Sequence, residues 1–375
     1  MPILLIAMSA AILFALQAII YRWFAQRGLS AQLSFEEEMV AEGETAVIIE
    51  QIVNRKALPL AAVRATFRLD RSLYFLDEEN VTVTDYTYRN DVYSLAGYEA
   101  MTCRLPVRCS QRGQFQIQEM KLTTNDLFFT RAYFTDIPQQ AGFLVCPGPV
   151  SQDKLEIPFR RMMGTLLTRR RTLEDPFELQ GIRPYQSYDG MKDINWKASA
   201  RSGEYQVNLH GYTSSQQVKI LLNLEQNDLW GRRGLLEEGI RIAAAYARVL
   251  IEQGVPVCVV SNGRDSFSGA AADTRYGAGK QHLRAIQETL ARVEYAVEDD
   301  HIVDLLRRER QSAESRQTVY VLISTSQEER MLAEYSELCR HCEGAQWIAP
   351  LPYGTPQMTE RCPRADTFRW EVAYE

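Results

Sequence analysis

The sequence predicts three structural parts: a membrane-spanning helix, an all-β sandwich-like module and a doubly wound α/β domain. Three observations lead to this prediction. Residues 2–21 carry no charge, residues 28–150 alternate between short apolar runs and turns, and residues 215–375 alternate between apolar strands and amphipathic helices. A chain of 375 residues suffices for two or three domains, and its 46% apolar residues can fill their cores.

Residues 1–27 are predicted to form a transmembrane anchor, because about 20 apolar residues span a bilayer core as a helix. Gln17 is the one strongly polar residue within the uncharged run. Trp23 suits the membrane interface, and Arg22 and Arg27 place positive charge on the C-terminal side of the run. We therefore expect a single-pass protein of the cell membrane, in contact with the lipid bilayer, whose soluble part is cytoplasmic. The alternative is a cleavable signal peptide, which usually opens with basic residues that are missing here.

Residues 28–150 are predicted to form the β-sandwich-like module. The segments 46–53 and 63–69 are apolar or alternating at strand length, and the turn-like segment 54–59 separates them. Short strands joined by turns are typical of antiparallel sandwiches. The module contains no histidine and no catalytic constellation, so we interpret it as a structural or contact domain.

Residues 215–375 are predicted to form the α/β domain. The segment 217–224 is an almost continuous apolar strand, as in parallel sheets. An apolar stripe runs along 235–253 at helical spacing, and Gly254 supplies a C-cap. Strands that alternate with helices favour a doubly wound sheet. Further strands are expected at 255–260, 318–324 and 346–349, and further helices at 281–296, 299–312 and 327–342.

A basic segment, 159–171, precedes the central part of the chain. Its arginines flank an apolar centre, with Arg160, Arg161, Arg169, Arg170 and Arg171 around Met162, Met163, Leu166 and Leu167. Three interpretations are open. The segment lies against anionic lipid, as basic amphipathic segments do, or it binds an acidic partner, or it is a solvated loop.

The linker region 151–214 contains the densest set of side chains that can both hydrogen-bond and stack. The candidate site residues are Arg183, Tyr185, Asp189, Lys192, Asn195, Trp196 and Arg201. Arginines pair bidentately with carboxylates, Trp196 is expected to bury its ring, and Asn195 is expected to tie a turn to the backbone. The motif is therefore either a buried Arg–Asp–Trp network that pins two domains together or a site for a partner or ligand. Catalysis is disfavoured, because the motif offers no histidine, cysteine or serine–base pair.

The same motif carries a resemblance to a known family. The segments Gly181-Ile-Arg183-x-Tyr185, Asp189, Lys192-x-Ile194-Asn195-Trp196-Lys197 and Ser199-Ala200-Arg201 stand in one ungapped register. This pattern resembles the signature of the domain of unknown function 58 family, and the resemblance covers nearly the whole chain. Two positions depart from it: Tyr188 stands where the family usually has glycine, and Lys192 replaces the usual arginine. Lysine cannot form a bidentate ion pair with a carboxylate, so binding of a carboxylate should be weaker at this position.

The resemblance implies that residues 215–375 fold like a von Willebrand factor A domain. Such domains often carry a metal site, D-x-S-x-S, after the first strand. This chain has Asn223-Leu-Glu225-Gln-Asn227 at that place, without the aspartate or the serines. Glu225 alone can still ligate a hard cation, but we expect no intact metal site and no cofactor. We interpret Gly277–Lys280 as a hairpin turn and not as a phosphate loop, because its flanking residues break that motif.

Two functions follow from these patterns. The leading hypothesis is a non-enzymatic, membrane-anchored cytoplasmic adaptor or scaffold. The family resemblance implies a MoxR-type AAA+ ATPase and a transglutaminase-like membrane protein as its partners. The alternative is a metal- or ligand-binding enzyme or sensor that uses the strand ends of the α/β domain. A net charge of −6 argues against a nucleic-acid partner.

Overall fold

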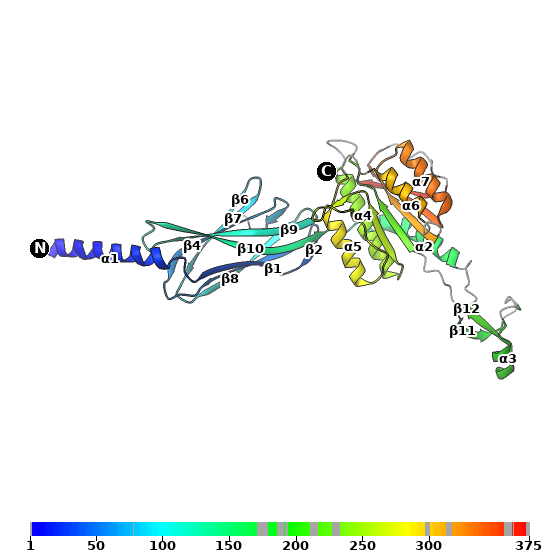
Figure 1. Ribbon diagram of the computed structural model, residues 1–375, viewed down its shortest axis with the longest axis horizontal. Helices are drawn as coiled ribbons and strands as arrows, with labels where there is room; N and C mark the ends of the chain where they lie inside the picture. The colour runs from blue at the N-terminus through cyan, green and yellow to red at the C-terminus, as the bar shows by residue number, and fades with distance from the viewer. Residues whose placement is uncertain are drawn as a thin grey trace. The chain divides into compact units, whose positions relative to one another are not determined.

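The computed structural model describes residues 2–77, 79–170, 179–185, 191, 194–210, 217–226, 233–296, 301–312, 317–355, 362 and 364–372. The chain divides into two compact units, Met1–Gly148 and Pro149–Glu375 (Figure 1). The first unit is a helix followed by strands, and the second is a mixed unit of strands and helices.

The first unit begins with helix α1 (Pro2–Phe24) and continues as two β-sheets. One sheet has the order β1-β3-β8-β5, with β1 at Leu29–Phe35, β3 at Thr45–Asn54, β8 at Ala100–Cys109 and β5 at Leu73–Phe75. The other has the order β2-β10-β9-β4-β7-β6, with β2 at Met39–Ala41, β10 at Ala132–Cys146, β9 at Gly113–Asn125, β4 at Leu60–Leu69, β7 at Thr87–Leu95 and β6 at Val81–Val83. Neighbouring strands are antiparallel except β2 and β10, which are parallel.

A single apolar core lies between these sheets. Ile48 and Ile52 of β3 alternate with outward residues, and they belong to the same buried cluster as Phe67 of β4 and Met120 of β9. Alternation with a period of two residues turns one face of each strand inward. The sequence prediction of an all-β sandwich is therefore confirmed.

The second unit is built on a five-stranded sheet in the order β14-β13-β17-β18-β19. The strands are β13 (Gln217–Leu222), β14 (Val257–Ser261), β17 (Thr318–Ile323), β18 (Gly344–Pro352) and β19 (Asp366–Val372), and all neighbours are parallel. Side chains of β13, β14 and β17 are buried on both faces. This is why these strands are almost continuous apolar runs in the sequence.

Helices cover both faces of this sheet (Figure 1). On one face, α2 (Gln152–Arg170), α4 (Arg233–Glu252) and α5 (Lys280–Arg292) bury residues against Ile220 and Val259. On the other face, α6 (Ile302–Gln311) and α7 (Glu329–His341) pack on Leu221 and Tyr320. The described residues therefore form a doubly wound α/β domain, as the sequence predicted.

Three features of this domain differ from the sequence predictions. The basic segment is not a solvated loop: its residues 159–170 belong to helix α2, whose Met162 is fully buried in the α/β core. The α/β domain therefore includes helix α2, which lies within the predicted linker region 151–214. Gly277–Lys280 is not a hairpin turn, because Gly279 is the N-cap of helix α5. Finally, the edge strand β19 was not predicted.

Short elements complete the second unit. Strands β15 (Arg264–Asp265) and β16 (Val293–Glu294) pair antiparallel near the carboxyl end of β14. Strands β11 (Leu179–Pro184) and β12 (Gln206–His210) form a separate two-stranded sheet, and helix α3 (Trp196–Ser202) precedes β12. These last three elements carry the central sequence motif.

Candidate functional site

The central motif folds into a small unit of one antiparallel strand pair and one short helix, which we call the hairpin motif (residues 179–185 and 194–207). In the register of β11 and β12, Arg183 lies opposite Val207. An isolated β-bridge joins Ile194 to Val207, and both side chains are buried. The two residues form the small apolar centre of the hairpin motif.

Polar side chains fix helix α3 to strand β12. Asn195 is the N-cap of α3, and its Oδ1 accepts a hydrogen bond of 2.9 Å from the backbone N of Ala198. The Ser199 hydroxyl donates to the carbonyl of Asn195 and accepts from the backbone N of Gln206, both at 2.8 Å. Gly203 ends the helix with a left-handed φ of 79°. The local fold of the hairpin motif is thus held by its own hydrogen bonds.

The aromatic side chains of the hairpin motif lie on its surface. Trp196 and Tyr205 are 61% and 60% exposed, so the expectation that Trp196 buries its ring is wrong. The physical reason is that α3 has only seven residues and none of them is buried. The rings instead pack on one another: Trp196 meets Tyr205 at 6.2 Å and 88°, and Tyr185 meets Tyr205 at 6.3 Å and 67°. We call these three residues the aromatic cluster.

Cationic side chains accompany the aromatic cluster. Lys197 and Arg201 are exposed and lie four residues apart on α3, which places them on one helix face. Trp, Tyr and Arg are the residue types that most often dominate the binding free energy of protein interfaces. The chemistry of this surface suits a protein partner that offers apolar and acidic groups.

The remaining predicted site residues are only partly described. The backbone of Arg183 lies in β11. Asp189 and Lys192 lie outside the described residues. In the proposed Arg–Asp–Trp network, the side chains of Arg201 and Trp196 are described, and both are exposed.

A second candidate site lies at the carboxyl edge of the parallel sheet. The first strand of the domain, β13, lies between β14 and β17, so the chain winds in opposite directions from it. Ligands of doubly wound folds bind outside the carboxyl ends of the strands at this point. Three buried polar residues follow the three strands there: Asn223, Asn262 and Ser324.

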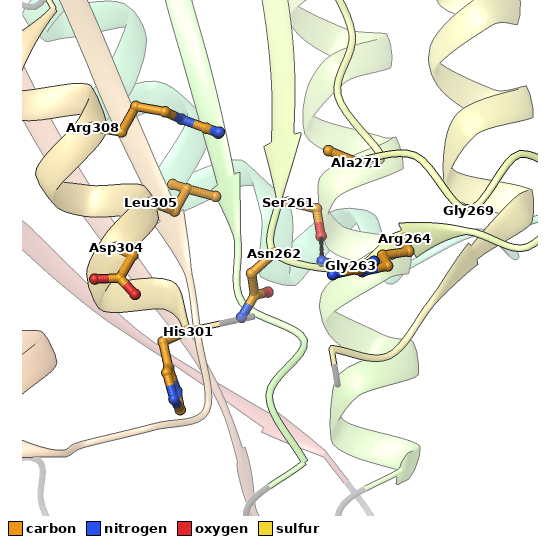
Figure 2. Close-up of a pocket in the computed structure, with 10 residues that line it drawn as sticks. All are labelled: Ser261, Asn262, Gly263, Arg264, Gly269, Ala271, His301, Asp304, Leu305 and Arg308. Carbon is orange, nitrogen blue, oxygen red and sulfur yellow. Dashed lines mark hydrogen bonds between the residues drawn. The ribbon is translucent and has the colours of Figure 1, made fainter. Parts of the chain in front are cut away.

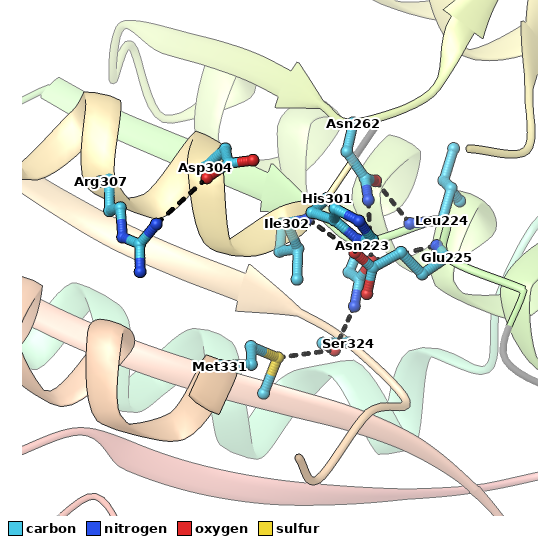
Figure 3. Close-up of polar contacts among 10 residues, drawn as sticks. All are labelled: Asn223, Leu224, Glu225, Asn262, His301, Ile302, Asp304, Arg307, Ser324 and Met331. Carbon is cyan, nitrogen blue, oxygen red and sulfur yellow. Dashed lines mark hydrogen bonds and ion pairs between the residues drawn. The ribbon is translucent and has the colours of Figure 1, made fainter. Parts of the chain in front are cut away.

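These residues hydrogen-bond to one another (Figure 3). The Asn223 Nδ2 donates to the Ser324 hydroxyl at 3.0 Å, and the Asn262 Nδ2 donates to the Asn223 Oδ1 at 3.1 Å. The Asn262 Oδ1 in turn accepts from the backbone N of Leu224 at 2.8 Å. The edge is therefore held by neutral amides and a hydroxyl.

The carboxylate of Glu225 has a structural partner. Its Oε1 accepts a 2.7 Å hydrogen bond from the backbone N of Ile302, the first residue of α6, and lies 3.5 Å from the His301 Nδ1 (Figure 3). A carboxylate at a helix N-terminus satisfies a free N–H and interacts favourably with the helix dipole. Within the described ranges, no three His, Cys, Asp or Glu residues are grouped so that they could hold a metal ion.

A cavity of about 470 Å³ lies beside this edge (Figure 2). It is bounded by the loop after β14 and by helix α6. Its charged and polar lining consists of Ser261, Asn262, Arg264, His301, Asp304 and Arg308. The Arg308 guanidinium lies 3.6 Å from the carboxylate of Asp273. Burial raises the pKa of Asp273 although Arg308 favours its ionised form.

Sequence reasoning pointed to this edge but not to the cavity. Glu225 was named from the altered metal motif. The residues of the cavity come from two segments, 261–271 and 301–308, and neither shows a recognisable motif. Only the topology of the sheet brings the two segments together.

The chain shows distant similarity to solved structures. No family model matches the chain, and no curated protein matches it. The chain is similar to the solved CARDB domain of a Pyrococcus furiosus protein (15% identity, 30% of this chain and 91% of that chain, TM-score 0.19). It is also similar to a non-cellulosomal cohesin from Archaeoglobus fulgidus (10% identity, 34% of this chain and 96% of that chain, TM-score 0.22). A third similar structure is the major pilin SpaD of Corynebacterium diphtheriae (11% identity, 29% of this chain and 33% of that chain, TM-score 0.22). Similarities this low support no statement about function.

Proposed function

We propose that this chain is a membrane-anchored, non-enzymatic adaptor that binds a protein partner through the aromatic cluster of its hairpin motif. The observation that carries this proposal is the exposure of Trp196 and Tyr205 on a locally well-bonded unit. Burial of apolar surface stabilises a complex by about 25 cal/mol per Å², and the exposed rings do not gain this free energy in the unbound chain. A partner that covers both rings gains that free energy on binding. Because the Asn195 cap already orders helix α3, binding does not have to order it.

The motif also supports a choice of partner. Its resemblance to the domain of unknown function 58 family implies a MoxR-type AAA+ ATPase, with a transglutaminase-like membrane protein as a second candidate. The von Willebrand factor A-like fold that the same resemblance implies is supported by the parallel sheet with helices on both faces. The hydrogen-bonded amides at its carboxyl edge fit a domain that binds partners without a metal ion.

The membrane part of the proposal rests on helix α1. The segment Ile3–Phe24 is long and apolar enough to cross a bilayer, with a mean hydropathy of 2.6 and an exposed 18-residue apolar stretch. We propose that α1 spans the cell membrane. Arg22 and Arg27 lie at its C-terminal end, so the positive-inside rule places the soluble part in the cytoplasm.

Capture from a detergent extract tests the adaptor function. Full-length bait should recover a MoxR-type ATPase, and the double variant W196A/Y205A should lose it. Tyr353→Ala is the matched control, because Tyr353 is an aromatic of the same unit that is 79% exposed. Folded wild-type bait that recovers neither an ATPase nor a membrane partner would contradict the proposal, as would equal capture by the double variant.

The cavity at the sheet edge favours a second candidate, a ligand-binding sensor or enzyme. Bound ligand stabilises the folded state in proportion to RT ln(1 + [L]/Kd). Mg²⁺, Ca²⁺, Mn²⁺ or a nucleotide should then raise the melting temperature of the wild-type protein, and stabilisation by the anionic nucleotide should be lost in Arg308→Ala. A melting temperature that stays constant across all of these additions counts against this candidate.

A further inference from the structure

The β-sandwich has two chemically different ends. The strand registers Leu29 with Asn54, Val53 with Ala100, and Asn125 with Ala132 place four loops at the end where α1 joins. These loops are 25–28, 55–59, 96–99 and 126–131, and we call this end the proximal end. The opposite, distal end carries the loops 36–38, 42–44, 70–72, 84–86 and 110–112.

Helix α1 is fixed to the proximal end by several contacts. The Tyr21 hydroxyl donates to the carbonyl of Pro59 at 2.9 Å, and the Gln26 Nε2 donates to the carbonyl of Phe134 at 2.7 Å. Ala25 is buried in the sandwich core. The end of the helix is therefore part of the sandwich and not a flexible tether.

The loop between β9 and β10 presents a large apolar tip beside this helix. Leu127, Phe128 and Phe129 are 50%, 56% and 60% exposed. The ring of Phe128 lies 5.6 Å from the ring of Phe14 in α1. Asp126 holds the loop from beneath, because its Oδ1 accepts from the backbone N of Thr130 at 2.6 Å. The apolar tip thus sits on a loop whose Asp126 carboxylate faces inward.

Backbone strain accompanies these exposed aromatics. Phe129 and the 75%-exposed Tyr98, in the loop between β7 and β8, have φ angles of 56° and 60°. Bulky residues rarely adopt positive φ, and such strain costs on the order of 1–3 kcal/mol per residue. Both residues lie at the proximal end. Backbone strain that holds aromatic rings on the surface is favourable when those rings contact lipid and not water.

Charge separates the two ends as well. Arg27, Arg55, Lys56 and Arg131 lie in the proximal loops, whose acidic residues Asp126 and Glu99 accept backbone hydrogen bonds. The distal loops contain Arg71 and Arg112 but carry mainly acidic residues, namely Glu36, Glu37, Glu38, Glu42, Glu44, Asp70 and Asp85. Basic residues next to a membrane helix are attracted to anionic lipid headgroups, and acidic residues are repelled.

We propose that the proximal end of the sandwich is seated in the lipid bilayer, with Leu127–Phe129 inserted among the acyl chains beside α1 and Tyr98 at headgroup level. This inference rests on the proposal that α1 spans the membrane. Phe14 lies ten residues before Phe24, or about 15 Å along the helix. A ring in contact with Phe14 is therefore below the headgroups when the end of α1 lies at the interface. Membrane seating of this kind holds the sandwich upright on the bilayer.

Photo-crosslinking in vesicles tests the inference. The photoreactive residue p-benzoylphenylalanine replaces Phe128, Tyr98, Tyr86 or Leu13 in the full-length chain, in vesicles of phosphatidylcholine and phosphatidylglycerol. Tyr86 is the matched control, an exposed aromatic in a distal loop, and the 65%-exposed Leu13 reports on α1 itself. We expect covalent lipid adducts at Leu13, Phe128 and Tyr98, and none at Tyr86, when the chain is analysed by mass spectrometry.

The possible outcomes separate the inference from the membrane anchor. Adducts at Leu13 without adducts at Phe128 overturn the inserted loop and leave the anchor in place. A cross-link from Phe128 to a second copy of the chain also overturns it, because the tip then covers a protein surface. If Leu13 forms no lipid adduct, the proposal that α1 spans the membrane is contradicted, and so is the inserted loop, because it depends on that proposal.

Discussion

The rings of Trp196 and Tyr205 meet edge to face, 6.2 Å apart and at 88°, and each side chain remains about 60% exposed. Contact between the rings holds both in one orientation without removing them from water. Such a pair is worth about 0.5–1.5 kcal/mol beyond the area it buries. The arrangement is suited to a preformed contact surface, because the partner does not have to order the rings.

Replacing Trp196 by alanine should change stability little. Its exposure limits the loss to the ring contact, so we expect about 1 kcal/mol or less in the free energy of unfolding. Trp347→Ala is the matched comparison, because Trp347 is 1% exposed and its removal should cost about 3–5 kcal/mol. Thermal unfolding of both variants in detergent micelles measures the difference. Equal losses would show that Trp196 is a core residue after all.

Asn195 should be replaceable by aspartate but not by alanine. Its side chain accepts the hydrogen bond from Ala198 that starts α3, and loss of an N-cap costs about 1 kcal/mol. In Asn195→Ala, the amides of α3 should exchange hydrogen about fivefold faster, which corresponds to that free energy. Asn195→Asp keeps the acceptor and should exchange like the wild type. Unchanged exchange in the alanine variant would show that the cap does not hold the helix.

The pair of Lys219 and Glu309 should be essential for the stability of the α/β domain. The Lys219 Nζ lies 2.7 Å from the Glu309 Oε2, and both side chains are less than 10% exposed. Glu309→Gln leaves the ammonium buried without a counter-charge, at a cost of about 3–5 kcal/mol. Changing both residues to leucine or methionine should recover most of this loss.

A surface pair provides the control for this prediction. Arg284 and Glu288 form an ion pair on the exposed side of α5, so Glu288→Gln should cost less than about 1 kcal/mol. The melting temperature of each variant distinguishes the cases. If Glu309→Gln has the same melting temperature as Glu288→Gln, the buried pair contributes no more to stability than a surface pair.

The stability of the β-sandwich should depend on pH through Glu50. This side chain is 1% exposed, and burial raises its pKa from 4.5 to about 7, although the hydroxyl of Tyr93 donates to its carboxylate at 2.7 Å. Between these pH values the unfolded chain loses the proton and the folded chain keeps it. The free energy of unfolding therefore falls as pH rises from about 4.5 to 7, by on the order of 3 kcal/mol, and then levels off.

Substitution with glutamine isolates this effect. Glu50→Gln has no proton to lose, so it should remove the fall in stability between pH 4.5 and 7. Glu119→Gln, at an exposed carboxylate of β9, should leave it in place. Denaturant unfolding of the sandwich at several pH values gives the measurement. A fall of the same size in Glu50→Gln would assign the dependence to another group.

Much of the fold was predictable because burial leaves a clear pattern in the sequence. Ile48 and Ile52 alternate with outward residues, and Ile220 to Leu222 form an unbroken apolar run, so a sandwich and a parallel sheet were both expected. Strand β19 was missed because Asp366, Arg369 and Glu371 interrupt its apolar residues at the edge of the sheet. Edge strands lack the double-sided burial that makes central strands recognisable.

The exposure of the candidate site was not predictable in the same way. Tryptophan is usually well buried, so composition alone favoured a buried Trp196. Its exposure follows from the shortness of α3, whose caps Asn195 and Gly203 enclose only seven residues. The mixed basic and apolar sequence of α2 likewise suggested a surface segment, although one face of this helix packs on the sheet.

The affinity of a purified MoxR-type ATPase for this chain tests the central claim most directly. Titration of the full-length protein in detergent micelles gives the Kd for the wild type, Trp196→Ala and the control Tyr353→Ala. An aromatic at the centre of an interface contributes about 1.4 kcal/mol or more, so Trp196→Ala should raise the Kd at least about tenfold while Tyr353→Ala leaves it unchanged. A Kd that is the same for all three proteins, or no binding by the folded wild type, would contradict the aromatic cluster as the docking surface.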